Sequence, residues 1–474
     1  MASQNISFDS IPSSIRKPGK YFEFNTRLAV RTLPANQQQM LIVAQRLAYG
    51  SVPALVPTQI FSDAQAADAF GAGSMAHRMC RAAIVANPYL QLTVCALDDG
   101  AGAAASATVT IEGEATISGF LNFFLGNDRV EIVVTSGDTA AEVAAAFKAA
   151  LDVRHELPVS ATVEAGIITL TARHKGTVPN RIDLACELSA KGITVTLSGT
   201  SLTGGAIDPD IATALAQVFG NQFDVIVTPY NDQAALTALR NYLDDVSGPM
   251  EQRPGVGIAA VDDGLATATT LAGQINSGRI LLAYLRGTRS PDYELAAAYG
   301  AVVAWEEDPA RPLNTLALTG IHAPPIPARL GRAEQESCLA NGIAPLEVGP
   351  GETVQIVRAI TTYTKNAENV ADIALLDLTT IRTLDYTRKA CRERISLRFP
   401  REKLSSRTPK KVRTELLDVL LKLDELEILE EVMANKDGLV VERDAQDPSR
   451  LNAKIPADVV NGLHVFAGRI DLLL

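Results

Sequence analysis

The side chains that most often carry catalysis or bind metal ions are few in this chain and widely scattered. None of the five histidines or five cysteines shows the H-x-x-x-H, C-x-x-C or H-E-x-x-H spacing of a zinc site, and no G-x-S-x-G motif offers a nucleophile. Asp262-Asp263 and Glu306-Glu307-Asp308 have the oxygen ligands that a hard cation prefers, but such acidic groups are more often solvated loop residues. The sequence therefore predicts no catalytic residue, no cofactor and no metal ion.

A nucleotide site would require a glycine-rich turn between a strand and the helix that follows it. The strands expected at 224–228 and 256–261 are followed instead by Pro229-Tyr230-Asn231 and by Asp262-Asp263-Gly264. Neither turn has the glycine spacing of a phosphate loop, and two adjacent carboxylates would repel phosphate. The pattern favours a structural sheet, with an α/β nucleotide-dependent enzyme carrying a β insert as the alternative.

One charged segment stands out. Residues 382–413 are rich in lysine and arginine, and residues 415–431 reverse the sign with a run of acidic side chains. Such a pattern is typical either of solvated helix faces or of complementary surfaces between subunits. Direct nucleic-acid binding is disfavoured, because aromatic residues are nearly absent from the segment and the whole chain carries a formal net charge of -11.

Both ends of the chain are unusually apolar. Termini are commonly polar and frayed, yet residues 5–24 and 461–474 carry spaced aliphatic and aromatic side chains. Pro12 and Pro18 favour an extended first segment. Such a segment can fold back as an edge strand of its own domain, or it can pair with the sheet edge of a neighbouring subunit.

The pattern of elements between these ends is α/β. A helix is expected over residues 37–48, and strands alternate with helices from residue 209 to residue 303. Residues 90–206 read instead as many short strands with one helix, whose Thr139-x-x-Glu142 sequence is a capping box. We interpret this region as an inserted, mostly β domain. Long helices are expected at 377–399 and 409–423, and a strand at 463–473.

Length and composition set further limits. With 474 residues the chain can form two or three domains. No apolar run approaches the roughly 18 residues of a membrane span, and the first residues do not form a secretory signal. The odd number of scattered cysteines indicates a reducing compartment and not a disulfide framework.

Several motifs, in their order along the chain, resemble those of one protein family. They are Ile6-Ser7-Phe8-Asp9, Ile11-Pro12, Arg16-x-Pro18-Gly19 and Tyr21-x-Glu23-Phe24 near the start, Gly137-Asp138-Thr139 and Gly176-Thr177-x-x-Asn180-x-Ile182-Asp183-Leu184 in the middle, and Ile455-Pro456 with Asn461-Gly462-Leu463-His464-Val465 at the end. The chain resembles the contractile tail sheath proteins of Mu-like bacteriophages over its whole length. A sheath from a related, pyocin-like contractile injection system is the nearest alternative.

The resemblance implies a structural protein without catalysis, in an α/β (α+β overall) fold with a central βαβ-type sheath domain. The expected parts are an extended N-terminal arm at 1–25, a discontinuous α/β sheath domain at 26–89 and 207–375, the inserted outer domain at 90–206, a C-terminal α/β sheath domain at 376–460 and an arm strand at 461–474. It also implies a virion tail location after assembly in the host cytoplasm. The expected partners are further copies of the chain in a helical polymer linked by strand exchange, the tail tube, the baseplate and the tail terminator, with no direct nucleic acid and no membrane insertion.

Two sets of residues are expected to carry this assembly. The arm residues predicted to contact neighbouring subunits are Phe8, Ile11, Tyr21, Phe22, Phe24, Leu463, Val465, Phe466, Ile470 and Leu472. The basic residues predicted to face the tube are Arg392, Arg394 and Arg398.

Overall fold

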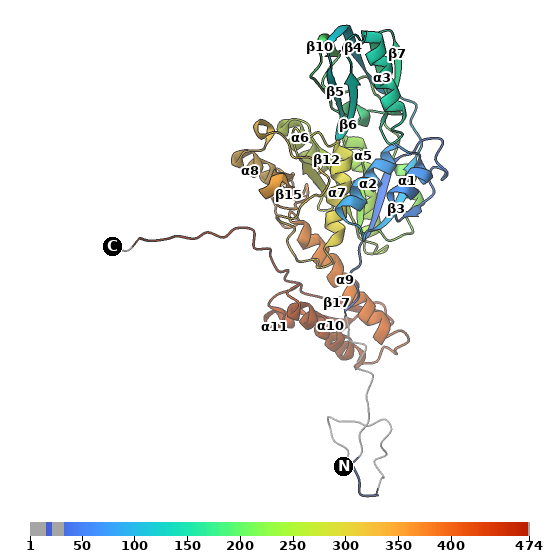
Figure 1. Ribbon diagram of the computed structural model, residues 1–474. Coiled ribbons are helices and arrows are strands. Elements are labelled where there is room, and N and C mark those ends of the chain that lie inside the picture. Colours follow the sequence, from blue (N-terminus) through green and yellow to red (C-terminus); the bar gives the residue numbers. More distant parts are fainter. Residues whose placement is uncertain (1–15, 21–32, 473–474) are drawn as a thin grey trace. The chain divides into compact units, whose positions relative to one another are not determined.

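The computed structural model describes residues 16–20 and 33–472, and it divides into two compact units (Figure 1). The larger unit comprises residues 36–386, 427–430 and 458–474, and the smaller unit is built mainly from Thr387–Leu426 and Glu431–Ala457. The α/β fold class predicted from the sequence is confirmed.

An eight-stranded sheet forms the core of the larger unit, with the strand order β15-β14-β13-β12-β11-β1-β3-β2. All neighbouring pairs are parallel except those of the two edge strands, β2 and β15. The strands are β1 (Gln39–Gln45), β2 (Thr58–Ile60), β3 (Gln91–Leu97), β11 (Val225–Val227), β12 (Val256–Val261), β13 (Ile280–Tyr284), β14 (Ala344–Val348) and β15 (Val354–Ile356).

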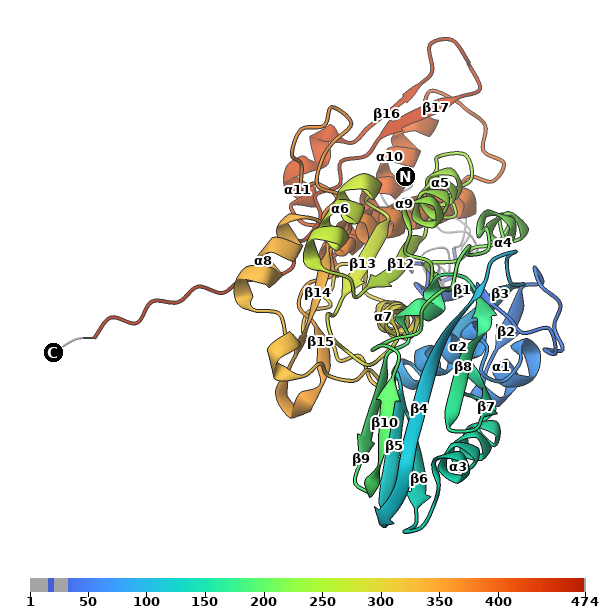
Figure 2. The same cartoon turned by 90° about the horizontal axis from the view of Figure 1, so that it is seen from above.

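Helices cover both faces of this sheet, as Figure 2 shows. On one face α7 packs against β1, β11 and β12, and α2 packs on α7; α4, α5 and α6 lie on the other face. The helices are α1 (Asp63–Phe70), α2 (Met75–Ala86), α4 (Ala212–Gln217), α5 (Gln233–Ser247), α6 (Leu265–Ile275), α7 (Asp292–Trp305) and α8 (Arg332–Ala340), with short 3-10 turns η3 (Ile326–Ala328) and η4 (Pro350–Glu352). Because α7 is enclosed by α2 and the sheet, almost all of its side chains are buried.

The helix predicted over residues 37–48 is wrong, because this segment is strand β1. Its residues Met40 to Gln45 are all buried, as expected of a strand in the middle of a parallel sheet with both faces covered. A continuous apolar run of this kind does not distinguish a buried strand from a buried helix by spacing alone.

A second domain is inserted after β3 and has its own apolar core. It holds a four-stranded sheet of order β10-β4-β8-β7, a three-stranded sheet of order β6-β5-β9, and a helix that packs on β7 and β6. The elements are β4 (Ala104–Ile117), β5 (Gly119–Leu125), β6 (Asp128–Val134), α3 (Ala140–Asp152), β7 (Val159–Glu164), β8 (Ile167–Lys175), η2 (Val178–Arg181), β9 (Leu184–Leu188) and β10 (Lys191–Leu197). The capping box predicted at Thr139 and Glu142 is present at the start of α3.

The inserted domain begins later than residue 90. Strand β3 pairs with β1 and β2 in the central sheet, so the insert runs from about residue 98 to residue 206. Its two ends lie side by side, since Ala103 and Ala206 form an antiparallel bridge. This adjacency is what allows a domain to be inserted without disturbing its host.

The smaller unit is mainly helical. It contains most of α9 (Leu378–Arg398), then α10 (Thr408–Glu425), α11 (Val432–Asn435), η5 (Lys436–Gly438) and a hairpin of β16 (Val440–Arg443) and β17 (Leu451–Lys454). The long helices predicted at 377–399 and 409–423 are therefore present nearly as expected. The first turns of α9, up to Tyr386, belong to the larger unit and not to a C-terminal domain that starts at residue 376.

Candidate assembly surfaces

The C-terminal arm, defined here as residues 461–472, is apolar and uncovered. It is extended without belonging to any strand, and Figures 1 and 2 both show it leaving the body of the larger unit. The exposed fractions of its large apolar side chains are 80% at Leu463, 78% at Val465, 86% at Phe466, 98% at Ile470 and 83% at Leu472. The predicted strand at 463–473 does not form within the single chain, because a strand requires a hydrogen-bonding neighbour.

The base of this arm is fixed to the larger unit. Asn314 Nδ2 lies 3.0 Å from His464 Nδ1, and His464 Nε2 lies 3.6 Å from Asp377 Oδ1. Asp377 in turn pairs with Arg358 across 2.7 Å. Burial and then the positive charge of Arg358 lower the pKa of His464, so the ring is neutral at physiological pH and acts as a hydrogen-bonding anchor. The uncovered part of the arm thus starts at about Val465.

The N-terminal arm residues predicted to contact a neighbour, Phe8, Ile11, Tyr21, Phe22 and Phe24, lie outside the described residues. The nearby residues 16–20 are described, and all five are exposed.

The structure places the three predicted tube-facing arginines in different environments on α9. Arg394 is only 4% exposed, and its Nη1 lies 2.6 Å from Asp418 Oδ2 and 3.1 Å from Glu415 Oε2 of α10. Burial alone would lower the pKa of Arg394, but the hydrogen bonds that it donates to these two carboxylates raise it. Arg394 therefore joins two helices of the smaller unit, and its charge is not at the surface of the single chain.

Arg398 and Arg392 differ from Arg394. Arg398 Nε lies 3.6 Å from Glu415 Oε2 with its side chain 23% exposed, and Arg392 is exposed. Of the three arginines predicted to face the tube, Arg392 and Arg398 remain candidates for that contact.

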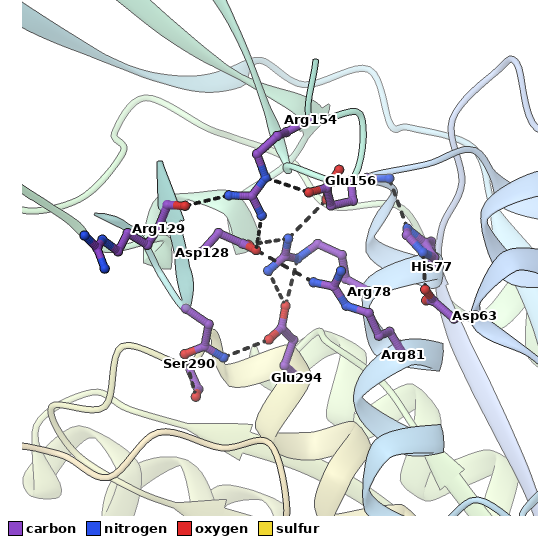
Figure 3. Close-up of polar contacts among 12 residues, drawn as sticks. Asp63, His77, Arg78, Arg81, Asp128, Arg129, Arg154, Glu156, Ser290 and Glu294 are labelled. Atoms are coloured by element: carbon purple, nitrogen blue, oxygen red, sulfur yellow. Dashed lines mark hydrogen bonds and ion pairs between the residues drawn. The ribbon is translucent and has the colours of Figure 1, made fainter. Parts of the chain in front are cut away.

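A polar junction joins the inserted domain to the central sheet domain (Figure 3). At its centre is Arg78 of α2, which is 1% exposed. Its Nη1 lies 2.7 Å from Asp128 Oδ2 at the start of β6, and its Nη2 lies 2.6 Å from Glu294 Oε1 of α7. Although burial acts to lower it, the pKa of Arg78 is raised, chiefly by Glu294. One buried cation thus ties together three elements from two domains.

Surrounding residues complete this junction. Asn127 Nδ2 donates to Glu294 Oε2 across 3.1 Å, Ser290 Oγ donates to Asn127 Oδ1 across 2.9 Å, and Arg154 Nη2 lies 3.3 Å from Asp128 Oδ1. Figure 3 shows the carboxylates of Asp128 and Glu294 turned toward Arg78. Sequence reasoning missed this junction, and the available signal was an arginine placed between the apolar residues Ala76 and Met79 of α2.

A second polar contact lies at the carboxyl edge of the central sheet, where many α/β proteins bind ligands. Arg181 Nη1 of the inserted domain lies 2.6 Å from Asp292 Oδ2 at the start of α7. Asn231, which follows β11, donates through Nδ2 to the same oxygen across 3.1 Å and to Ala260 O across 2.7 Å. Side chains of the two domains therefore pair with each other at this edge.

Replacing residues 104–205 with a short Gly-Ser linker is expected to leave the rest of the chain folded. The two domains have separate apolar cores, apart from Val178 of the insert, which packs into the core of the central sheet domain. Removing the insert exposes Arg78 and Asp292 to water instead of leaving them buried and unpaired. Thermal unfolding followed by circular dichroism should retain one cooperative transition for the central sheet domain. Non-cooperative melting of the deletion variant would contradict the independence of the central core.

Other side chains with chemical potential are structural in this fold. No three His, Cys, Asp or Glu residues among those described are arranged to hold a metal ion. Burial raises the pKa of Cys95, Cys338 and Cys391 to about 11 each, so these thiols are protonated and unreactive at neutral pH. Within residues 16–20 and 33–472, no helix has the length and apolarity that crossing a bilayer requires.

Comparison with known proteins defines the class to which this architecture belongs. The family model described as phage tail sheath protein central domain matches residues 204–362, and the phage tail sheath C-terminal domain matches residues 370–472. The Mu-like prophage FluMu tail sheath protein of Haemophilus influenzae is 34% identical over 489 aligned residues, which cover 99% of this chain and all of that protein.

Two solved structures of sheath tail proteins have the same fold. The sheath tail protein of Desulfitobacterium hafniense has a TM-score of 0.53 at 13% identity, covering 94% of this chain and 97% of its own. The sheath tail protein of Listeria innocua has a TM-score of 0.51 at 15% identity, covering 91% and 94%.

The chain belongs to the phage tail sheath protein family. It is a structural protein of the virion tail and not an enzyme, and proteins of this family form helical polymers. Its Mu-like relationship, expected from the terminal motifs, is confirmed by the full-length match.

Proposed function

We propose that copies of this chain assemble in the host cytoplasm into a contractile sleeve around a rigid tail tube. A baseplate lies at one end of the sleeve and a tail terminator at the other. Contraction drives the tube through the host envelope, so that the phage genome can be delivered. Rigid domains move against each other during this change while the arms keep neighbouring subunits connected.

The observation that carries this proposal is the uncovered apolar C-terminal arm. An extended segment with spaced apolar side chains is suited to pair with the sheet edge of another subunit. Each main-chain hydrogen bond of such a strand contributes about 0.5–1.5 kcal/mol net. Burial of each large side chain adds about 1.5–3 kcal/mol. A link of this strength can persist through a large rearrangement of the domains that it joins.

The hairpin of the smaller unit is the acceptor that we propose for this arm. Within the described residues, β16 and β17 form a sheet of only two strands, so each has an outer edge without a neighbouring strand. Isolated two-stranded sheets are marginally stable, and added strands stabilise them. The arm residues at the other end of the chain, Phe8, Ile11, Tyr21, Phe22 and Phe24, are proposed to supply a second donated strand.

Transfer of the arm to the next subunit is a heterologous contact, which repeats without closing and builds a helix. Electron microscopy of the purified full-length chain with tail tubes should show sleeves of uniform width. If separate subunits and no sleeves are seen with every preparation of tubes, the proposal is contradicted.

We further propose that Arg392, which is exposed, and Arg398, whose side chain is 23% exposed, contribute to contact with the tube. Arg392→Glu combined with Arg398→Glu is expected to reduce sleeve formation on tubes strongly, and added salt should weaken the wild-type contact because exposed charges are screened beyond about 8 Å at physiological ionic strength. Sleeve yield by sedimentation measures both effects.

Arg394→Glu provides the contrasting variant for this experiment. It places a third carboxylate beside Glu415 and Asp418, so it should lower the melting temperature of the subunit itself. If wild type and the Arg392/Arg398 variant have the same melting temperature and give equal sleeve yields, these residues of α9 do not contribute to contact with the tube.

A further inference from the structure

A groove of about 460 Å³ opens at the amino edge of the central sheet, opposite the edge at which Arg181 meets Asp292. It lies where β1 and β3 begin and where the edge strand β2 ends. Phe61 and Tyr89 line it and are 76% and 83% exposed, and the ring of Tyr89 lies 6.0 Å from that of Trp305 at the end of α7. A group of uncovered aromatic side chains is typical of a surface that binds another protein.

Three glutamines on neighbouring strands also line the groove: Gln39 in β1, Gln91 in β3 and Gln59 in β2. All three are exposed, and none of their side-chain amides has a hydrogen-bond partner in the described part of the chain. Each amide can donate to a carbonyl group and accept from an N–H group, so the three suit the backbone of an extended peptide. The outer edge of β2 is occupied, because the side chain of Gln65 bonds Gln59 O and Phe61 N.

The rim of the groove next to Trp305 is acidic, since Glu306, Glu307 and Asp308 follow this residue directly. Glu306 lies 3.7 Å from Arg311, whereas Glu307 and Asp308 are exposed and form no ion pair with any described residue. Exposed aromatic rings beside these carboxylates can also hold a cation over their faces. The groove therefore suits an extended peptide that carries positive charge.

Residues 16–20 of the chain have this chemistry. They read Arg16-Lys17-Pro18-Gly19-Lys20, and all five are exposed. Pro18 favours an extended backbone both at its own position and at the residue before it. Extended segments that contain proline dock into grooves lined by aromatic side chains. The three cations of the segment complement the acidic rim of the groove.

We propose that the groove at the amino edge of the central sheet docks residues 16–20 of a neighbouring copy of the chain. The groove and the segment are both exposed in the single chain, so a second copy can cover both. This contact rests on the proposed function in that it needs neighbouring subunits, and it adds an anchor at a place other than the β16–β17 hairpin. A weak contact is sufficient, because the arm holds the segment near the groove and raises its effective concentration.

Fluorescence of Trp305 tests the contact, because it is the only tryptophan of the chain and its ring neighbours Tyr89 in the groove. The receptor is the full-length chain with Arg16→Ser, Pro18→Gly and Lys20→Ser, whose own segment no longer competes. The probe is an acetylated and amidated peptide of residues 16–20, which has no aromatic residue and adds no emission. The peptide should shift the emission of the receptor to shorter wavelength until the groove is saturated. Added salt should weaken the binding several-fold, because exposed charges are screened.

Further changes to the receptor locate the binding site. Tyr89→Ser removes a largely exposed ring, so the fold should persist while the peptide binds about tenfold more weakly. Glu307→Lys reverses an exposed charge and should weaken both the binding and its dependence on salt. Val153→Ser and Glu164→Lys are the matched controls at exposed positions of the inserted domain, and they should bind the peptide like the unchanged receptor.

Three outcomes would overturn the proposal. The first is a receptor whose emission shows no saturable change with the peptide, and the second is a Tyr89→Ser receptor that binds the peptide as tightly as before. The third concerns the wild-type chain without peptide, whose emission should shift as its concentration rises; an emission that stays constant would contradict docking between copies. The peptide titration uses separate subunits, so its failure is distinguishable from a failure of sleeves to form.

Discussion

Truncation after Val465 is expected to abolish sleeve formation while it changes the melting temperature of the subunit by no more than about 1–2 °C. The side chains removed include Phe466, Ile470 and Leu472, which are at least 83% exposed and so contribute little to the fold of their own subunit. In a sleeve, each would contribute about 1.5–3 kcal/mol through burial against the neighbour. Electron microscopy and differential scanning calorimetry of the same preparation measure the two effects.

The position of the cut matters. Cutting after Asn461 also removes His464, whose ring contacts Asn314 and Asp377, and therefore risks destabilising the larger unit. A full-length variant in which Phe466, Ile470 and Leu472 are all changed to Ser tests the apolar contacts without shortening the chain. The matched control is Arg469→Ala with Asp471→Ala, which removes an exposed ion pair from the same arm.

The control variant should assemble like wild type, and the serine variant should not. Normal sleeves from the truncated chain would show that the C-terminal arm is dispensable. A large fall in the melting temperature of the subunit after truncation at Val465 would instead show that the arm stabilises its own domain.

Arg78→Met should be the most destabilising single substitution, costing about 3–5 kcal/mol. Glu294, at 6% exposure, would be left as a buried carboxylate without its cation, and Asp128, at 8% exposure, would keep only its longer contacts with Arg154 and Arg81. The long apolar side chain of methionine fills much of the space, so the loss reports charge and not volume. Urea denaturation of the full-length chain measures the effect.

Arg81→Met is the matched control for this experiment. Arg81 lies on the same helix, but its side chain is 32% exposed and its Nη2 is 3.9 Å from Asp128 Oδ1, so the expected loss is below about 1 kcal/mol. Changing Glu294 to Gln together with Arg78 to Met should restore part of the lost stability, because one uncompensated charge is removed. Equal stabilities for the Arg78 and Arg81 variants would show that the junction does not hold the two domains.

Much of the organisation was predictable from local sequence signals. The capping box at Thr139 and Glu142 places the start of α3. The alternation of strands and helices after residue 209 predicts the parallel sheet. These features can be predicted because they depend on residues that are close together in the sequence. The family resemblance also depends on short sequence motifs.

Features that depend on distant residues were not predictable in the same way. The apolar spacing of Met40 to Ala44 suits a helix as well as a buried strand, and only pairing with β3 and β11 makes it β1. Strand β3 was assigned to the inserted domain because nothing in its own sequence says which sheet it joins. Arg394 looked like a surface charge until α10 brought Glu415 and Asp418 against it.

The sequence by itself determined the class of protein, the presence of an insert and the apolar character of both ends, since composition and local motifs carry that information. Only the tertiary structure decided which charges are buried in pairs, at Arg78, Arg181 and Arg394, and which stretch of the C-terminal arm is left uncovered. The physical reason is that burial and charge pairing are properties of residues that meet in space, and the sequence separations here reach 216 residues between Arg78 and Glu294.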